Sequence, residues 1–277
     1  MPYSLASGPH ARAVYGSAMT SPVQNPPAVA RPFAFGGSFV GTLHERIGLP
    51  CQDACCELRI DPDQLVISVA DGLGSAERAD EGAVLAANSA CKAVTEALAE
   101  SAEIGAAAEA GVRAAREALE RQAEGKDCEL RNFATTLIVA VAQGDSLQVA
   151  QIGDGAVVAA LEDELDLVSG PGDSEYVNEV TPLTSDYWES ALQISELRSG
   201  VRCFAVFTDG CQRAALKRER SGFVAFPGFF TPVFEFALGL AEPDSGSIAI
   251  EQLLKSAKFR DNCEDDSTLV IGVLENG

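Results

Sequence analysis

The chain has 277 residues, of which 47% are hydrophobic and 22% charged, and these values are ordinary for a soluble globular protein. Its 41 acidic and 20 basic residues give a formal net charge of −21, which argues against nucleic acid and anionic membrane surfaces as partners because both are negatively charged. The eight cysteines form no Cys-x-x-Cys pair, and no apolar stretch reaches the roughly 20 residues of a membrane span. We therefore expect a cytoplasmic protein with reduced cysteines.

The N-terminal segment, residues 1–32, is rich in Pro, Ser, Ala and Gly and contains no continuous apolar region of the kind found in signal peptides. It predicts a flexible leader. Residues 33–277 contain no internal repeat and no evident linker, so they predict a single domain.

The first half of that domain alternates between strand and helix patterns. A strand is expected within residues 33–44, and two more, at 53–60 and 64–70, flank the turn "DPDQ". Two alanine-rich segments, 77–100 and 102–124, carry apolar residues at helical spacing and predict an antiparallel helix pair joined near Ser101.

The second half begins with a hairpin, residues 134–142 and 147–155, which the segments 156–163 and 164–170 extend. Residues 171–190 are polar and predict a loop or flap, residues 201–210 a buried strand, and Cys211 the start of a helix. Residues 222–240 are rich in phenylalanine; a helix at 246–259 and a strand at 267–274 close the chain. This order, without regular βαβ alternation, predicts an α+β layered domain with mainly antiparallel sheets.

Acidic residues recur where apolar strands end or begin. They are Asp53 in "CQDA", Asp71 in "VADG", Asp154 in "IGDG", Asp209 in "FTDG", and the pair Asp265 and Asp266 in "EDDST". Any single Asp-Gly is more often a turn than a metal ligand. Several carboxylates at one edge of a sheet would repel one another unless a cation neutralised them, and such oxygen ligands favour Mg²⁺ or Mn²⁺.

In this order the motifs "CQDA", "VADGLGSAERADEGA", "ATTL", "IGDG", "FTDG" and "DDSTLV" resemble those of the metal-dependent type 2C serine/threonine protein phosphatases, and in particular a divergent bacterial branch. The resemblance covers about residues 38–275. It implies a four-layer αββα sandwich, in which two antiparallel sheets are flanked by helix pairs. It also implies that residues 33–277 form the catalytic domain.

The resemblance further implies a centre of two metal ions. Asp71 would bridge both ions and the carbonyl of Gly72 would bind the second. Asp209 and Asp265 would hold the first ion, while Asp53 would act through metal-bound waters. Two ions about 3.5–4 Å apart can share a hydroxide that attacks phosphorus in line with the departing serine or threonine oxygen. Asp71 and Asp209 are accordingly the expected catalytic carboxylates.

Two further assignments follow from the resemblance. Asp154 matches the position that binds a third, weaker ion in some relatives. The family commonly has Asp-Asn-x-Thr before the last strand, and this chain contains Asp-Asn at 261–262. Alignment on the threonine instead places Asp265 on the ligand and Asp266 on the asparagine, which leaves Asp261 in a loop.

The phosphate-binding group is the main departure from the family pattern. Many relatives carry an arginine where this chain has Gly48, and the nearest replacements are His44 and Arg46. A histidine with a pKa of about 6.5 could also protonate the departing alkoxide. His44 is therefore predicted as a catalytic or phosphate-binding residue, against the alternative of a loop histidine with a structural hydrogen bond.

These expectations point to a monomeric bacterial signalling enzyme that removes phosphate from the protein substrates of a serine/threonine kinase. Two alternatives remain open at this point. One is a pseudophosphatase that binds a phosphoprotein or a regulatory partner without turnover, and the other is a metal hydrolase for small phosphoesters.

Overall fold

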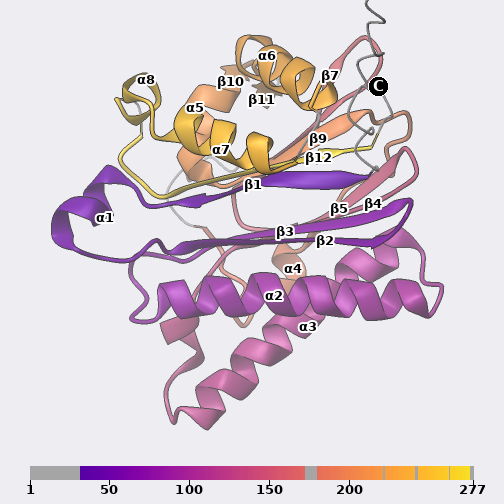
Figure 1. Cartoon of the computed structure of the whole chain (residues 1–277). Helices are drawn as coiled ribbons and strands as arrows, with labels where there is room; N and C mark the ends of the chain where they lie inside the picture. Colours follow the sequence, from indigo (N-terminus) through magenta and orange to yellow (C-terminus); the bar gives the residue numbers. More distant parts are fainter. Residues whose placement is uncertain (1–31, 172–179, 221, 241–242, 262, 275–277) are drawn as a thin grey trace, which may run out of the picture.

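The computed structural model of the chain describes residues 32–171, 180–220, 222–240, 243–261 and 263–274 (Figure 1). The predicted leader, residues 1–32, lies outside the described residues except for Pro32. The central part of the predicted flap, residues 172–179, also lies outside them. In the described part of the chain, no helix has the length and apolar character needed to cross a bilayer.

The first sheet has five antiparallel strands in the order β2-β3-β4-β5-β8. They are β2 (Asp53–Asp61), β3 (Gln64–Asp71), β4 (Leu137–Gln143), β5 (Ser146–Ile152) and β8 (Gln193–Ile194). The two predicted hairpins, β2–β3 and β4–β5, are confirmed. Because β3 and β4 are central strands, nearly all of their side chains are buried, and this explains their continuous apolar runs.

Two long helices, α2 (Ala79–Ala99) and α3 (Ile104–Gly125), cover the outer face of the first sheet (Figure 1). They pack closely because their buried positions carry mostly alanine. Gly111 lies where a Cβ would come within 2.9 Å of Val94 Cγ2. The chain turns between the helices at Ser101, which has a φ of 66°, so the predicted helix pair is confirmed.

The second sheet has five antiparallel strands in the order β1-β12-β9-β6-β7. They are β1 (Phe33–Phe39), β12 (Ser267–Val273), β9 (Cys203–Phe207), β6 (Ala156–Ala160) and β7 (Leu165–Ser169). Its outer face is covered by α6 (Pro227–Leu238), α7 (Pro243–Leu254) and the short α5 (Gln212–Ala215) and α8 (Ala257–Arg260) (Figure 1). The phenylalanine-rich segment forms much of this layer.

The inner faces of the two sheets pack on each other through a shared apolar core. Ile67 and Ile138 contribute to it from the first sheet, and Val206 and Val270 from the second. The molecule is thus the predicted αββα sandwich. The remaining elements are η1 (Leu130–Phe133), α4 (Trp188–Ala191), η2 (Asp209–Cys211) and the hairpin of β10 (Leu216–Glu219) and β11 (Gly222–Ala225).

Two local expectations are wrong. The helix predicted from Cys211 is only one turn long, because the chain from Leu216 pairs with β11 and the strand ladder overrides a weak helix propensity. The first strand ends at Phe39 rather than near His44, and a short helix, α1 (Thr42–Ile47), follows it. Gly41 begins this change of direction, at a point where a Cβ would lie 2.2 Å from the carbonyl carbon of Asp265.

The strand register brings several strand ends to one edge of the sandwich. Asp53 at the start of β2 pairs with Asp71 at the end of β3. In the second sheet, Phe207 at the end of β9 pairs with Leu269 near the start of β12. Helix α1 joins β1 of one sheet to β2 of the other at this edge (Figure 1).

Candidate metal centre

Four of the predicted metal-binding carboxylates line one cavity of about 300 Å³ at this edge, and Asp266 lines it with them. Asp71 is the last residue of β3, Asp209 begins η2 directly after β9, and Asp265 precedes β12. Asp154 lies in the turn between β5 and β6. Each of these four carboxylates lies at or close to the end of a buried strand, so the fold brings together acids that lie far apart in the sequence.

These carboxylates strongly disfavour one another's ionised form. Burial raises the pKa of Asp71 well above its ordinary value, and the charges of Asp53 and Asp209 raise it further. Burial, and then the charges of Asp154 and Asp265, raise the pKa of Asp209 to about 6. Burial also raises the pKa of Asp154. Without a counter-charge, the cavity would hold several carboxylates whose charges repel.

Divalent cations fit this donor set. No lysine or arginine is found among the described residues that line the cavity, so no permanently charged cation of the protein offsets the acids there. Within the described ranges, no three side chains of His, Cys, Asp or Glu are grouped so that they could hold an ion by themselves. Mg²⁺ suits such a site, because it keeps several waters and uses only one or two carboxylates.

Asp53 is buried and does not line the cavity. Its Oδ2 accepts hydrogen bonds from the hydroxyls of Thr208 (2.7 Å) and Thr268 (2.8 Å). Burial raises its pKa to about 7, although these two hydrogen bonds act in the opposite direction. We predicted that Asp53 acts on the metal ions through bound water and not as a direct ligand. This stays a prediction, and a carboxylate outside the cavity wall is compatible with it.

Gly72 brings the backbone into the cavity wall. Its N–H donates to the carbonyl of Gln52 at 3.0 Å. A Cβ at this position would lie 2.5 Å from the carbonyl oxygen of Ala79. The close packing therefore requires glycine here, and it places the carbonyl predicted as a ligand next to Asp71.

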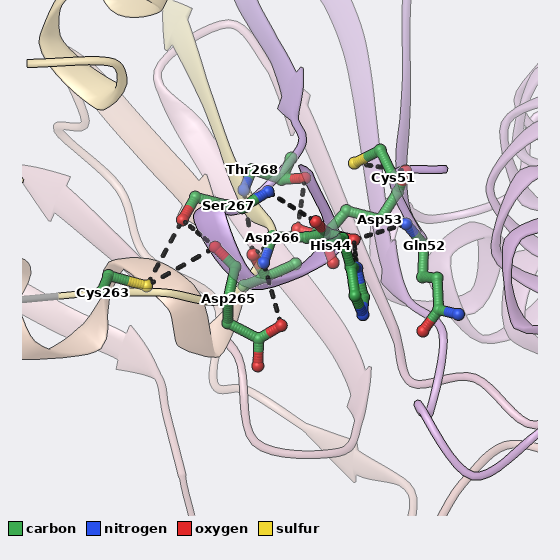
Figure 2. A network of polar contacts seen from close by, with 11 residues as sticks. His44, Cys51, Gln52, Asp53, Cys263, Asp265, Asp266, Ser267 and Thr268 are labelled. Carbon is green, nitrogen blue, oxygen red and sulfur yellow. Dashed lines mark hydrogen bonds and ion pairs between the residues drawn. The ribbon is translucent and has the colours of Figure 1, made fainter. Parts of the chain in front are cut away.

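Asp266 is the centre of a buried hydrogen-bond network (Figure 2). It is 3% exposed and accepts hydrogen bonds from the backbone N–H groups of Gly41 (2.7 Å) and Gln52 (2.5 Å). Its Oδ2 also lies 2.9 Å from Nδ1 of His44. Asp266 thus connects α1 and the start of β2 to β12. It therefore has a structural environment, which differs from that of its neighbour Asp265.

His44 lies in the wall of the cavity, on α1, and its ring is held by Asp266. In Figure 2 the side chains of His44, Asp265 and Gln52 extend to the same side of the network. From the sequence, a structural hydrogen bond and a position beside the site were treated as alternatives for His44. The structure shows both features.

Arg46 is not brought into the cavity. Its side chain is 62% exposed and lies 3.5 Å from Glu264. Gly48, at the position of the missing arginine, ends α1 in the left-handed region with a φ of 72°. The expectation that Arg46 binds the substrate phosphate consequently has no support from its position. Asp261, as expected, is an exposed residue after α8.

Gln52 is a cavity residue that sequence reasoning missed. Its Oε1 is the buried side-chain atom that lacks a hydrogen-bond partner among the residues described. Such an atom is costly unless a ligand or water satisfies it. The motif "CQDA" contained the signal, but a glutamine before a strand has no distinctive meaning without the position of the cavity.

Comparisons with known proteins agree on one family. The family model for protein phosphatase 2C matches residues 40–255. Serine/threonine-protein phosphatase 3 of Escherichia coli is 34% identical over 249 residues, which cover 85% of this chain and 96% of that protein.

Solved structures show the same fold at low sequence identity. Serine/threonine phosphatase Stp1 from Staphylococcus aureus has a TM-score of 0.56 at 13% identity, covering 95% of this chain and 100% of its own. A bacterial serine phosphatase has a TM-score of 0.57 at 14% identity, and the match covers 90% of this chain and 99% of that phosphatase.

Proposed function

The chain belongs to the protein phosphatase 2C family, and from this premise we propose how its acidic cavity carries out phosphate hydrolysis. It is a metal-dependent protein serine/threonine phosphatase, and therefore a phosphoric monoester hydrolase that acts on phosphoserine and phosphothreonine in proteins. The observation that carries this function is the cavity in which Asp71, Asp154, Asp209 and Asp265 meet. A pseudophosphatase is not favoured, because such a protein would not need this complete set of carboxylates.

The metal centre would contain two divalent ions, Mg²⁺ or Mn²⁺. The residues that would hold them are Asp71, the carbonyl of Gly72, Asp209 and Asp265. Asp53 would orient water from behind them, and Asp154 would bind a third, weaker ion. When bound, the ions provide a water that ionises near neutral pH and offset the charge of the phosphoryl oxygens.

The carboxylates contribute by their rigidity. Asp71 and Asp209 are fixed by the ends of β3 and β9. Positions held in this way need little rearrangement when the phosphoryl group arrives. Preorganised charge of this kind is usually a large part of catalysis.

We propose that His44 protonates the departing oxygen. Since Nδ1 faces the carboxylate of Asp266, the other ring nitrogen, Nε2, is the one available to a substrate in the cavity. Asp266 is itself fixed by two backbone N–H groups, so it can keep the ring in one orientation. An acid held in this way would assist a serine alkoxide, which is a poor leaving group.

The substrate class follows from the family and the cavity. We propose phosphoproteins produced by a bacterial serine/threonine kinase, hydrolysed in the cytoplasm by a monomer as part of signalling. Leu43 lines the cavity and is 41% exposed. A peptide could contact this apolar side chain, whereas a small phosphoester would not reach it.

Release of phosphate from a phosphoserine peptide and from an aryl phosphate, measured with Mn²⁺ and with EDTA, tests this function. We expect release that requires Mn²⁺ and a higher kcat/KM for the peptide. No Mn²⁺-dependent release from either substrate would refute the proposal, whereas release from the aryl phosphate alone would indicate a hydrolase of small phosphoesters.

A further inference from the structure

A second cavity of about 340 Å³ adjoins the metal centre. It shares Leu43, Asp209 and Asp265 with the central cavity. Its wall also contains Arg213, a residue of α5 that sequence analysis did not connect with the site. The two cavities therefore lie side by side, and Arg213 brings a positive charge to the side of an otherwise acidic centre.

A phosphorylated substrate needs such a charge. The protein has a net charge of −21, and the described wall of the central cavity contains neither lysine nor arginine. Gly48 has no side chain to offer, and Arg46 lines neither cavity. Arg213 lines the adjoining cavity, although it lies far from the motif in which such a residue was sought.

We propose that Arg213 binds an anionic group of the substrate in this second cavity. The inference rests on the proposed function. A guanidinium matches an oxyanion with two parallel hydrogen bonds, which suits either the phosphate itself or a carboxylate beside the phosphorylated residue. Leu43, which also lines this cavity, could supply an apolar contact for the same part of the peptide.

The backbone around Arg213 is anchored to the metal centre. Helix α5 follows η2, which begins with Asp209, and Nε2 of Gln212 donates to the carbonyl of Asp154 at 2.6 Å. At Gly210 a Cβ would lie 2.0 Å from the carbonyl oxygen of Asp266, so this turn is closely packed. A group bound by Arg213 would consequently have a defined position relative to the catalytic carboxylates.

The test compares Arg213→Gln, Arg213→Lys and the control Arg121→Gln. Arg121 lies on α3, is 67% exposed, and its loss changes the net charge by the same amount. Each protein is assayed with an aryl phosphate and with phosphoserine peptides that carry aspartate or alanine beside the phosphoserine. We expect Arg213→Gln to raise KM about tenfold or more, as for loss of a charged hydrogen bond, with little change in kcat.

The substrates identify the group that Arg213 binds. A higher KM for all three substrates means that it binds the phosphate, while a higher KM for the aspartate peptide alone means that it binds the neighbouring carboxylate. Arg213→Lys should recover part of the affinity, since it keeps the charge but loses the planar fork. The control variant should match the wild type.

Calorimetric binding of a phosphonate peptide, which cannot be hydrolysed, separates this inference from the proposed function. It is measured with Mn²⁺ and does not depend on turnover. Unchanged KM and unchanged peptide affinity in Arg213→Gln would overturn the inference even in an active enzyme. Loss of Mn²⁺ affinity in the same variant would also overturn it, because Arg213 would then act on the metal centre and not on the substrate.

Discussion

Replacing Asp209 with asparagine should stabilise the metal-free protein at pH 8 while removing its activity. Burial and the charges of Asp154 and Asp265 raise the pKa of Asp209 from an ordinary 3.8 to about 6. This difference corresponds to a cost of about 3 kcal/mol for keeping the ionised group in the folded state. Because the side chain is only partly buried, we expect the variant to gain about 1–3 kcal/mol in the free energy of unfolding.

The sign follows from linkage. A carboxyl whose folded-state pKa is raised contributes most stability below its unfolded pKa, and this contribution is lost as the pH rises through the folded pKa. For Asp209 the loss occurs between about pH 4 and pH 6. Asparagine does not ionise, so the advantage of the variant should be full at pH 8, about half as large at pH 5, and small below about pH 4.

Urea unfolding in EDTA at pH 8 and pH 5, followed by circular dichroism, measures this effect. Each kcal/mol corresponds to about 2–4 °C in Tm for a domain of this size, which a thermal scan can check. Asp163→Asn, in the exposed turn between β6 and β7, removes the same charge away from the cavity and serves as the control. With Mn²⁺ the wild type should become more stable than the Asp209→Asn variant, because only the wild type binds the ions tightly and gains stability from them.

Two results would refute the reasoning. One is a variant that is no more stable than the wild type in EDTA at pH 8. The other is a gain of equal size at pH 5, which would mean that packing at residue 209, and not the charge of the carboxylate, limits the stability of the cavity.

Three further substitutions test individual roles. Asp71→Asn should abolish hydrolysis in a folded protein, because the bridging charge is lost, and near-wild-type turnover would contradict this. Asp154→Ala should lower turnover but keep two tightly bound ions; calorimetry that shows loss of a tight site would move Asp154 into the primary centre. His44→Ala should slow turnover of a phosphoserine peptide far more than that of an aryl phosphate, whose phenolate leaves without a proton. Equal losses on both substrates would indicate that His44 binds phosphate, and no loss would leave it a purely structural role.

The sequence alone predicted the elements whose signal is local. The alternation and apolar runs around β2 and β3, the alanine-rich spacing of α2 and α3, and the closing strand β12 each depend on neighbouring residues, and all are present. The carboxylates at strand ends were recognised for the same reason, and their order along the chain led to the family. Local pattern failed after Asp209, where pairing of β10 with β11 decided the structure against helix propensity.

Tertiary structure decided which side chains meet. No spacing in the sequence indicates that Asp266 accepts hydrogen bonds from Gly41 and Gln52 and holds His44, because these contacts depend on how β12 lies beside the chain that joins the two sheets. The same packing leaves Arg46 on the surface and places Arg213 in the wall of a cavity that Asp209 and Asp265 also line. The sequence determined the chemistry present at each strand end, since that is encoded by adjacent residues. Only the fold determined the distances between strand ends, since those are set by register and packing between residues far apart in the chain.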